Sequence, residues 1–296
     1  MISIAMATYN GEKYLKQQID SILNQSIQDF ELVVCDDCSK DNTWSILEEY
    51  AQQDDRIRIF KNETNLGVKH NFEKAISLTK GEFIAFSDQD DIWMPNHLEL
   101  LLKAIRNKSM ACGNAEMIYE DGTPMNMTLQ YQDGFDYIPE DDLKKALTVI
   151  LFRNPFQGAS MLIRRELSEK AGNVPDGVGF HDEWLASYAC FFGGINYITT
   201  PVLKYRRLEK SVTGLKNIRR SKIHAWRYHH IYPDRIHIIN AIIKRLENPT
   251  DRQTELLRRL KKIYLRNNSY RGKVLNGIYK LRHYKDIYSC DSTHWL

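Results

Sequence analysis

The feature that most constrains the fold is an alternation of short apolar runs with amphipathic segments in the N-terminal part of the chain. The apolar runs have the length and β-branched content of strands, and the segments between them have the spacing of helices with one buried face. Strands are expected at residues 2–7, 30–35, 56–60 and 83–87, and helices at about 12–25, 43–52 and 71–79. This order predicts an α/β fold with a mostly parallel sheet and helices on both faces.

Polar clusters follow three of the predicted strands. They are Thr8-Tyr9-Asn10, Asp36-Asp37 and Asp88-Gln89-Asp90-Asp91. Ligands of such sheets bind at the carboxyl ends of the strands, and these ends meet at one edge. All three clusters are therefore expected to line one crevice.

The acidic cluster has two interpretations. Alternate residues at a strand end point the same way, so Asp88 and Asp90 are expected to face one ligand. Mg²⁺ or Mn²⁺ held by one or two carboxylates completes its shell with substrate phosphates, which describes a nucleoside-diphosphate site. The alternative is an acidic loop that caps a helix beginning near Pro95.

The other two clusters are open to similar alternatives. Asp36 and Asp37 suit either N-caps for the helix beginning at Thr43 or acceptors for the imide N–H of uracil or thymine. The segment Thr8-Tyr9-Asn10 suits either a plain turn or stacking and hydrogen bonds to a base.

The strand-end motifs together resemble family 2 glycosyltransferases of the GT-A fold, a Rossmann-like fold. The resemblance covers roughly residues 1–215, and its motifs are Thr8-Tyr9-Asn10-Gly11, Gln25-Ser26, Phe30 to Ser39, Asn65-Leu66-Gly67 and Ser87 to Trp93. The Asp88-Gln89-Asp90-Asp91-Ile92-Trp93 segment is similar to bacterial rhamnosyltransferases of surface polysaccharide synthesis.

The resemblance implies a role for each motif position. The nucleotide-binding segment is Thr8, Tyr9 and Asn10, with Glu12 nearby. Asp37 matches the pyrimidine-binding carboxylate, assisted by Asp36, and Asp88 lies near the ribose with Gln89 beside it. Asp90 matches the metal ligand beneath the diphosphate, next to Asp91.

A candidate general base lies in the second half of the chain. Asp182 precedes an amphipathic stretch at 185–192, so it suits either a helix N-terminus stabilised by the helix dipole or a base that deprotonates an acceptor hydroxyl. The His-Asp-x-Trp segment resembles the family's base motif and favours Asp182, with Glu183 as the reserve base and as an acceptor-binding residue. His181 suits an orienting contact to Asp182, a contact to the diphosphate, or a plain core or surface histidine. Trp184 suits a sugar contact or the core.

Two further segments carry donor and acceptor predictions. Gly158 and Ala159 begin a loop-to-strand segment similar to the family segment beneath the donor sugar, although an ordinary strand after a small-residue turn fits equally. Arg206 and Arg207 resemble the family's distal loop, and their planar guanidinium groups suit a diphosphate. Leu208 stands where a histidine is common in the family. The contact that this histidine would make to the metal or the diphosphate would then come from Arg206, Arg207 or Lys210.

Charge divides the chain unevenly. The formal net charge is +3, yet residues 201–296 carry +16 and residues 1–200 carry −13. We predict a nucleotide-sugar half at 1–110, an acceptor-binding and catalytic half at 111–216, and a helical basic extension at 217–296. The segment 254–265 has apolar and basic sides, which suits either an anionic membrane surface or packing on the sheet. Nucleic acid is disfavoured as a partner because the acidic crevice repels phosphate chains.

The sequence therefore predicts an inverting, Mg²⁺- or Mn²⁺-dependent glycosyltransferase. Its donor would be dTDP-L-rhamnose or a UDP-sugar, and its acceptor a glycan or a lipid-linked oligosaccharide of a cell-surface polysaccharide. The odd number of cysteines, five, and the absence of a long apolar stretch favour the cytoplasm or the inner face of the plasma membrane. The alternatives are a nucleotidyltransferase and a non-enzymatic protein that binds membranes or nucleic acid.

Overall fold

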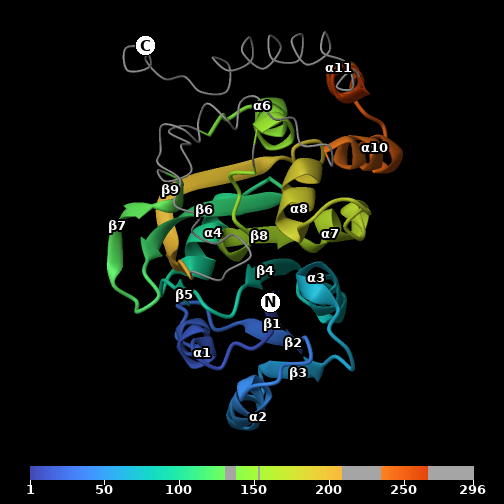
Figure 1. Ribbon diagram of the computed structural model, residues 1–296. Helices are drawn as coiled ribbons and strands as arrows, with labels where there is room; N and C mark the ends of the chain where they lie inside the picture. Colours follow the sequence, from blue (N-terminus) through green and yellow to red (C-terminus); the bar gives the residue numbers. More distant parts are fainter. Residues whose placement is uncertain (131–137, 153, 209–234, 266–296) are drawn as a thin grey trace.

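The N-terminal half has the predicted alternation. The computed structural model describes residues 1–130, 138–152, 154–208 and 235–265. Its first elements are β1 (Ile2–Thr8), α1 (Leu15–Leu23), β2 (Phe30–Asp36), α2 (Thr43–Gln53), β3 (Ile57–Lys61), α3 (Gly67–Leu78) and β4 (Phe83–Ser87). The four strands pair in parallel in the order β3-β2-β1-β4, which confirms the predicted parallel arrangement in this half (Figure 1).

The second half makes the sheet mixed. Its elements are β5 (Ile92–Trp93), α4 (His97–Ile105), β6 (Met110–Ile118), β7 (Pro124–Thr128), α6 (Asp142–Leu147), the π-helical turn η1 (Thr148–Phe152), the 3₁₀ turn η2 (Gly158–Ser160), β8 (Met161–Arg164), α7 (Arg165–Ala171), α8 (His181–Ala189) and β9 (Ile195–Arg206). Strand β8 lies antiparallel between β4 and β6, and β9 runs parallel to β6. The sheet has nine strands in the order β3-β2-β1-β4-β8-β6-β9-β5, with β7 on β6.

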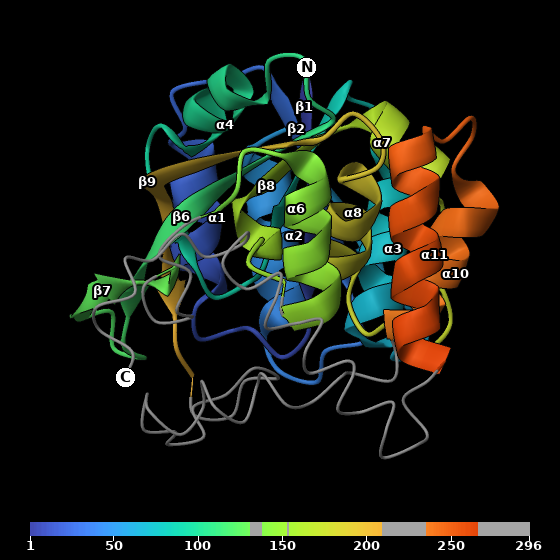
Figure 2. The same ribbon diagram turned by 90° about the horizontal axis from the view of Figure 1, so that it is seen from above.

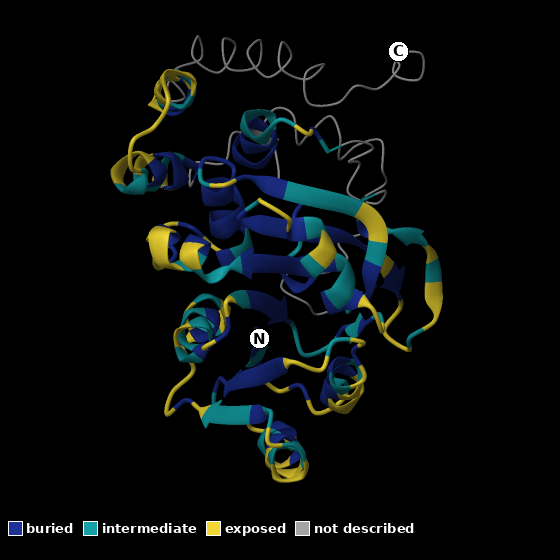
Figure 3. Ribbon diagram, turned by 180° about the vertical axis from the view of Figure 1, so that it is seen from behind, coloured by how far each residue is buried: buried dark blue, intermediate teal, exposed yellow. Residues whose placement is uncertain are grey.

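Helices cover both faces of the sheet, as predicted. Successive strand residues point to opposite faces, so Ile4 of β1 packs in the cluster that contains α1, α2 and α4. Its neighbour Ala5 packs in the other cluster, with α3, α7 and α8. Figure 3 shows the strands at the centre of the sheet as buried and the outer sides of the helices as exposed.

Two C-terminal helices belong to the second of these clusters. They are α10 (Arg235–Arg245) and α11 (Asp251–Leu265). The apolar side of α11, including Leu257 and Leu260, is buried, and the Tyr264 hydroxyl donates to the Ile150 carbonyl at 2.7 Å. Figure 2 shows both helices side by side along one flank of the domain. The apolar side of α11 is therefore covered by the protein itself, and its basic side faces solvent.

Helix α3 begins earlier than predicted. It begins at Gly67 rather than Asn71, because the Asp37 carboxylate accepts the N–H groups of Leu66 and Gly67 at 2.7 and 2.8 Å. Helix α8 begins at His181 and includes Asp182 in its first turn, so Asp182 lies at a helix N-terminus as predicted. Within the described ranges, no helix is long and apolar enough to span a bilayer.

Candidate active site

The strand register brings the predicted polar clusters to one edge of the sheet. Thr8 at the end of β1 lies opposite Asp36 of β2, and Met6 lies opposite Ser87 of β4, the residue before Asp88. Strand β8 runs the other way beside β4, so its first residues, preceded by η2, lie at the same edge. The structure thus brings the nucleotide-binding segment, the aspartate pair, the acidic turn and Gly158–Ala159 together.

Asp36 holds the loop that follows β2. It is fully buried, and it accepts hydrogen bonds from the Thr8 hydroxyl at 3.1 Å and the Ser39 N–H at 3.0 Å. The Ser39 hydroxyl donates to the same carboxylate. These contacts fix the strand end and leave Asp36 a supporting position behind Asp37.

Asp37 connects β2 to α3 and retains acceptor capacity. One oxygen accepts from the Asn62 amide at 2.8 Å and from the Leu66 N–H, and the other accepts from the Gly67 N–H. An ionised carboxylate offers about four acceptor positions, so the three donors leave one for a ligand N–H. Asn71 accepts from the same Asn62 amide at 2.9 Å, which fixes the orientation of the group.

The nucleotide-binding segment combines a fixed backbone with an exposed ring. Asn10 has a positive φ of 48°, its N–H donates to the Ser39 hydroxyl at 2.9 Å, and its side chain accepts from the Lys40 N–H at 2.8 Å. Glu12 accepts from the Asn42 N–H at 2.9 Å and from its amide at 2.7 Å. The Tyr9 side chain is 47% exposed and offers its ring to a base.

The acidic turn concentrates negative charge. Burial, followed by the charges of Asp90 and Asp182, raises the pKa of Asp88 to about 7. Burial also raises the pKa of Asp90, and burial with the neighbouring aspartates raises that of Asp91. Asp91 accepts the Arg206 N–H at 3.0 Å with one oxygen, and its other oxygen is buried without a hydrogen-bond partner among the described residues.

Arg206 supports the acidic turn with the groups predicted for a diphosphate. Its Nε donates to the Asp90 carbonyl at 2.8 Å, one terminal nitrogen donates to the Glu120 carbonyl at 2.9 Å, and the other donates to the Gln17 side chain at 2.7 Å. The residue is 4% exposed. Arg207, the other arginine predicted to bind the diphosphate, has a buried Nε without a hydrogen-bond partner among the described residues.

Residues 209–234, which include Lys210 and the rest of the distal loop, lie outside the described residues. Leu208 is the last described residue before them and is half-buried.

Asp182 stands at the start of α8, next to η2. Its Cβ is 3.4 Å from the place that a Cβ on Gly158 would occupy, and one carboxylate oxygen accepts the Glu183 N–H at 2.6 Å. Burial and then the charge of Glu183 raise the pKa of Asp182 to about 7. A carboxylate that titrates near neutral pH suits a general base. Gly158 and Ala159 are both buried beside it.

The neighbours of Asp182 have structural partners. Glu183 pairs with Arg235 of α10, and both side chains are buried. Trp184 is fully buried, and its ring nitrogen donates to the Gly172 carbonyl at 3.3 Å. The predicted sugar contact of Trp184 is thus at odds with its place in the core, and the acceptor contact predicted for Glu183 competes with an ion pair.

His181 occupies an aromatic cluster. Its ring centroid is 4.0 Å from that of Phe72 and 5.1 Å from that of Phe86, and burial lowers its pKa to about 3. Both ring nitrogens are buried without hydrogen-bond partners among the described residues. The ring therefore lies in the core, which was one of the predicted alternatives for His181.

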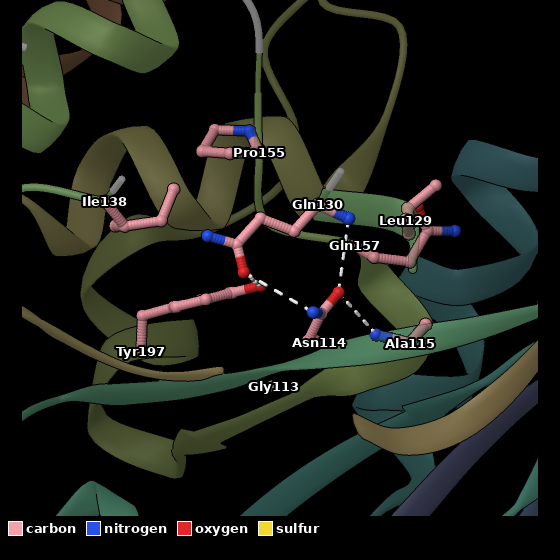
Figure 4. Close-up of a pocket in the computed structure, with 9 residues that line it drawn as sticks. All are labelled: Gly113, Asn114, Ala115, Leu129, Gln130, Ile138, Pro155, Gln157 and Tyr197. Atoms are coloured by element: carbon pink, nitrogen blue, oxygen red, sulfur yellow. Dashed lines mark hydrogen bonds between the residues drawn. The ribbon is translucent and has the colours of Figure 1, made fainter. Parts of the chain in front are cut away.

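A small cavity of about 10 Å³ lies at the same edge, beside Gln157 and η2 (Figure 4). The Asn114 amide and the Tyr197 hydroxyl both donate to the Gln130 side chain at 3.4 Å. Asn114 also accepts the Ala115 N–H at 2.8 Å. The volume is about that of one water. Neutral amides and a tyrosine hydroxyl therefore border this edge of the sheet.

The residues at the acidic turn suit a divalent cation that arrives with a diphosphate. Mg²⁺ commonly takes one or two protein carboxylates and completes its shell with phosphate oxygens and water. Asp90 is half-buried, and the orphaned Asp91 oxygen adds to a negative charge that Arg206 only partly offsets. No group of three or more acidic, His or Cys side chains forms a ready-made metal site within the described part of the chain. The fit is therefore to a cation shared with a ligand.

The chain belongs to glycosyltransferase family 2. The family model "Glycosyl transferase family 2" matches residues 3–185, which is more than half of the chain. A glucosyltransferase of Escherichia coli, "UDP-Glc:alpha-D-GlcNAc-diphosphoundecaprenol beta-1,3-glucosyltransferase WfgD", is 34% identical over 161 residues, covering 53% of this chain and 63% of that protein. Glycosyltransferase GlyG of Streptococcus pneumoniae is 35% identical over 108 residues, 36% of each chain. The chain spans 38–63% of the length of the first curated relatives that it matches.

Solved structures show that the fold is GT-A. The TarS fragment 1–349 of Staphylococcus aureus in complex with UDP-GlcNAc superposes with a TM-score of 0.60 at 18% identity, over 90% of this chain and 71% of that one. The mannosyltransferase PcManGT of Pyrobaculum calidifontis, solved with GDP-Man and Mn²⁺, gives 0.58 at 18% identity, over 98% and 76%. The predicted fold class is confirmed, with the correction that the sheet is mixed.

Proposed function

We propose that this chain is an inverting, metal-dependent glycosyltransferase of cell-surface polysaccharide synthesis. It moves a sugar from a nucleoside-diphosphate donor to a glycan or lipid-linked acceptor. The observation that carries the proposal is the meeting of Asp182 with the acidic turn at the edge that also holds Tyr9 and Asp37. Asp182 is near enough for its charge to raise the pKa of Asp88, although the two residues come from opposite halves of the chain.

The chemistry requires one base on the protein. In a single displacement, the acceptor hydroxyl attacks the anomeric carbon from the side opposite the diphosphate, and its proton passes to a carboxylate oxygen of Asp182. One oxygen of Asp182 accepts the Glu183 N–H, which orients the carboxylate. Asp90 would hold Mg²⁺ or Mn²⁺, which would neutralise the charge of the departing diphosphate. The two-carboxylate arrangement of glycoside hydrolases is therefore unnecessary.

The proposed donor is dTDP-L-rhamnose or a UDP-sugar. The remaining acceptor position on Asp37 suits the imide N–H that uracil and thymine share, and the exposed Tyr9 ring suits stacking. The rhamnosyltransferase-like sequence from Asp88 to Trp93 supports the first donor. The donor named in WfgD and the ligand of the TarS structure support the second.

We also propose a cytoplasmic location with peripheral contact to the inner face of the plasma membrane. The exposed side of α11 carries Arg252, Arg258, Arg259 and Lys262, although Arg252 also pairs with Asp141, and Arg258 and Arg259 with Glu255. Since the apolar side of this helix is buried in the domain, the contact would be electrostatic. Cosedimentation with anionic vesicles that disappears in high salt is expected, and equal binding to neutral vesicles would contradict it.

A thermal-shift panel of nucleotide sugars tests the proposed activity. Wild-type protein with Mn²⁺ is expected to be stabilised by dTDP-rhamnose or a UDP-sugar more than by GDP-mannose or nucleoside triphosphates. Asp90→Ala should remove the part of the shift that depends on Mn²⁺. Affinity that is unaffected by a chelator and by Asp90→Ala would refute metal dependence, and preference for a nucleoside triphosphate would favour a nucleotidyltransferase.

A further inference from the structure

The side chain of Gln89 links the two halves of the proposed donor site. The Tyr9 N–H donates to the Gln89 side-chain oxygen at 2.8 Å, and the Gln89 side-chain nitrogen donates to the Tyr9 carbonyl at 3.0 Å. These two bonds repeat the pairing of adjacent strands across residues that lie 80 positions apart in the sequence. The amide of Gln89 supplies a donor and an acceptor side by side in one planar group, as a peptide bond does.

The contact joins segments that carry different parts of the donor. On one side of the link, the Asp37 N–H donates to the Thr8 carbonyl at 2.8 Å, so the Tyr9 backbone is also tied to the loop proposed to bind the base. On the other side, Gln89 is next to Asp90, the proposed metal ligand. The Gln18 amide donates to the Ser87 hydroxyl at 2.8 Å and fixes the start of the acidic turn.

Gly11 leaves the space that the link requires. A Cβ at this position would overlap the amide of Gln89. The backbone at Gly11 lies outside the left-handed region, so an alanine is compatible with the backbone, and the atoms nearest to its Cβ would be those of the Gln89 amide. The two bonds to Tyr9 use one N–H and one oxygen lone pair of the Gln89 amide, so the protein fixes the plane of this amide before any ligand binds.

We propose that Gln89 is a positioning residue that couples the Tyr9 segment to the acidic turn, so that the nucleoside and the cation-bound diphosphate are held at a fixed distance. The inference rests on the proposed function and adds a residue to it. We call the two hydrogen bonds between Gln89 and Tyr9 the brace. Since the brace connects the two subsites, a cation at the acidic turn raises nucleoside affinity through Gln89 as well as through the phosphates.

A double-mutant cycle between Gly11 and Gln89 tests the brace. The measurement is calorimetric affinity for UDP and dTDP, with and without Mn²⁺. Gln89→Ala is expected to weaken binding about 5- to 10-fold, the loss of two modest hydrogen bonds, and to reduce the gain from Mn²⁺. Gly11→Ala alone should weaken binding similarly, because its methyl group displaces the amide. The double variant should bind within about 2-fold of Gln89→Ala, since the methyl group then meets no side chain.

The outcomes separate the brace from a structural role and from the proposed function. Gln53→Ala, an exposed glutamine at the end of α2, is the matched control and should leave the affinity unchanged. Losses that multiply in the double variant, or a loss of stability without a loss of affinity, would overturn the brace alone. Wild-type protein that binds neither UDP nor dTDP would overturn the proposed function. Hydrogen exchange of the Tyr9 amide, which should accelerate in Gln89→Ala, tests the link itself without any ligand.

Discussion

Replacing Asp182 with asparagine separates a catalytic base from a helix cap. Asparagine has almost the same shape and also caps helix N-termini, so a role limited to α8 would survive the change. It cannot accept a proton from an acceptor hydroxyl. We therefore expect Asp182→Asn to bind nucleotide sugar normally and to lose transfer by at least about 100-fold, the usual contribution of a general base.

The same substitution should change stability in a direction that a cap would not. The pKa of Asp182 is raised from 3.8 to about 7, so the folded state holds a proton there that the unfolded state releases. Below about pH 4 both states hold the proton, so Asp182 does not lower the free energy of unfolding. Between about pH 4 and pH 7 the unfolded state loses the proton first, and the free energy of unfolding falls. A pKa shift of this size lowers the free energy of unfolding by at most roughly 4 kcal/mol at high pH. Partial exposure of Asp182 to water reduces this loss to about 2 kcal/mol. The lost interaction with the helix dipole is smaller, about 0.3–1 kcal/mol.

Urea denaturation at pH 5 and pH 8, together with a transfer assay, measures both effects. Relative to wild type, Asp182→Asn should be more stable at both pH values, and the gain at pH 5 should be under about half of the gain at pH 8, because the penalty of the wild-type carboxylate develops between about pH 4 and pH 7. Asp176→Asn provides the matched control, since Asp176 is exposed in the loop before α8. Turnover close to wild type would eliminate Asp182 as the base. A stability difference that does not change with pH would refute the electrostatic argument, even if transfer is lost.

Three other substitutions have defined outcomes in urea denaturation. Arg206→Lys should lower the free energy of unfolding by about 2–4 kcal/mol, because an ammonium group cannot reach the three acceptors of the buried guanidinium, whereas Arg207→Lys should cost far less. Leu260→Ala in α11 should cost about 2–4 kcal/mol, and Leu265→Ala, at an exposed position, should cost under about 0.5 kcal/mol; equal small effects would contradict the packing of α11 in the core. His181→Phe should keep the aromatic contacts and reduce the loss of stability between about pH 6.5 and 3, because the folded state keeps this ring neutral while the unfolded state protonates it.

The elements and the strand-end clusters were predictable because they depend on periodicity. Buried strands and amphipathic helices repeat at fixed intervals, and parallel strands place their carboxyl ends together whatever the details of packing. The same reasoning applies to the third strand, β3, whose end the prediction did not use. Asn62 follows β3 as Asp36 ends β2, so a fourth strand-end polar residue was available in the sequence, and it fixes the orientation of Asp37.

The roles of Arg206 and Gln89 were not predictable in this way. An arginine near a proposed diphosphate site has the same local sequence whether it binds the ligand or supports the turn that does. The difference lies in its partners, and the Asp90 carbonyl lies 116 positions away in the sequence. The partners of Gln89 lie 80 positions away. Such contacts depend on how the second half of the sheet closes on the first, which local patterns do not encode.

The packing of α8 distinguishes Asp182 from Glu183, which the sequence motif does not. Both acidic residues lie in the first turn of α8, where either would cap the helix. Adjacent helical residues point about 100° apart, so both cannot face the same crevice. Glu183 faces α10 and pairs with Arg235, whereas Asp182 faces Gly158 and the acidic turn. Helix α10 therefore pairs with the competing carboxylate of Glu183, and the proposal that Asp182 is the base rests on the packing of α8 as well as on the motif.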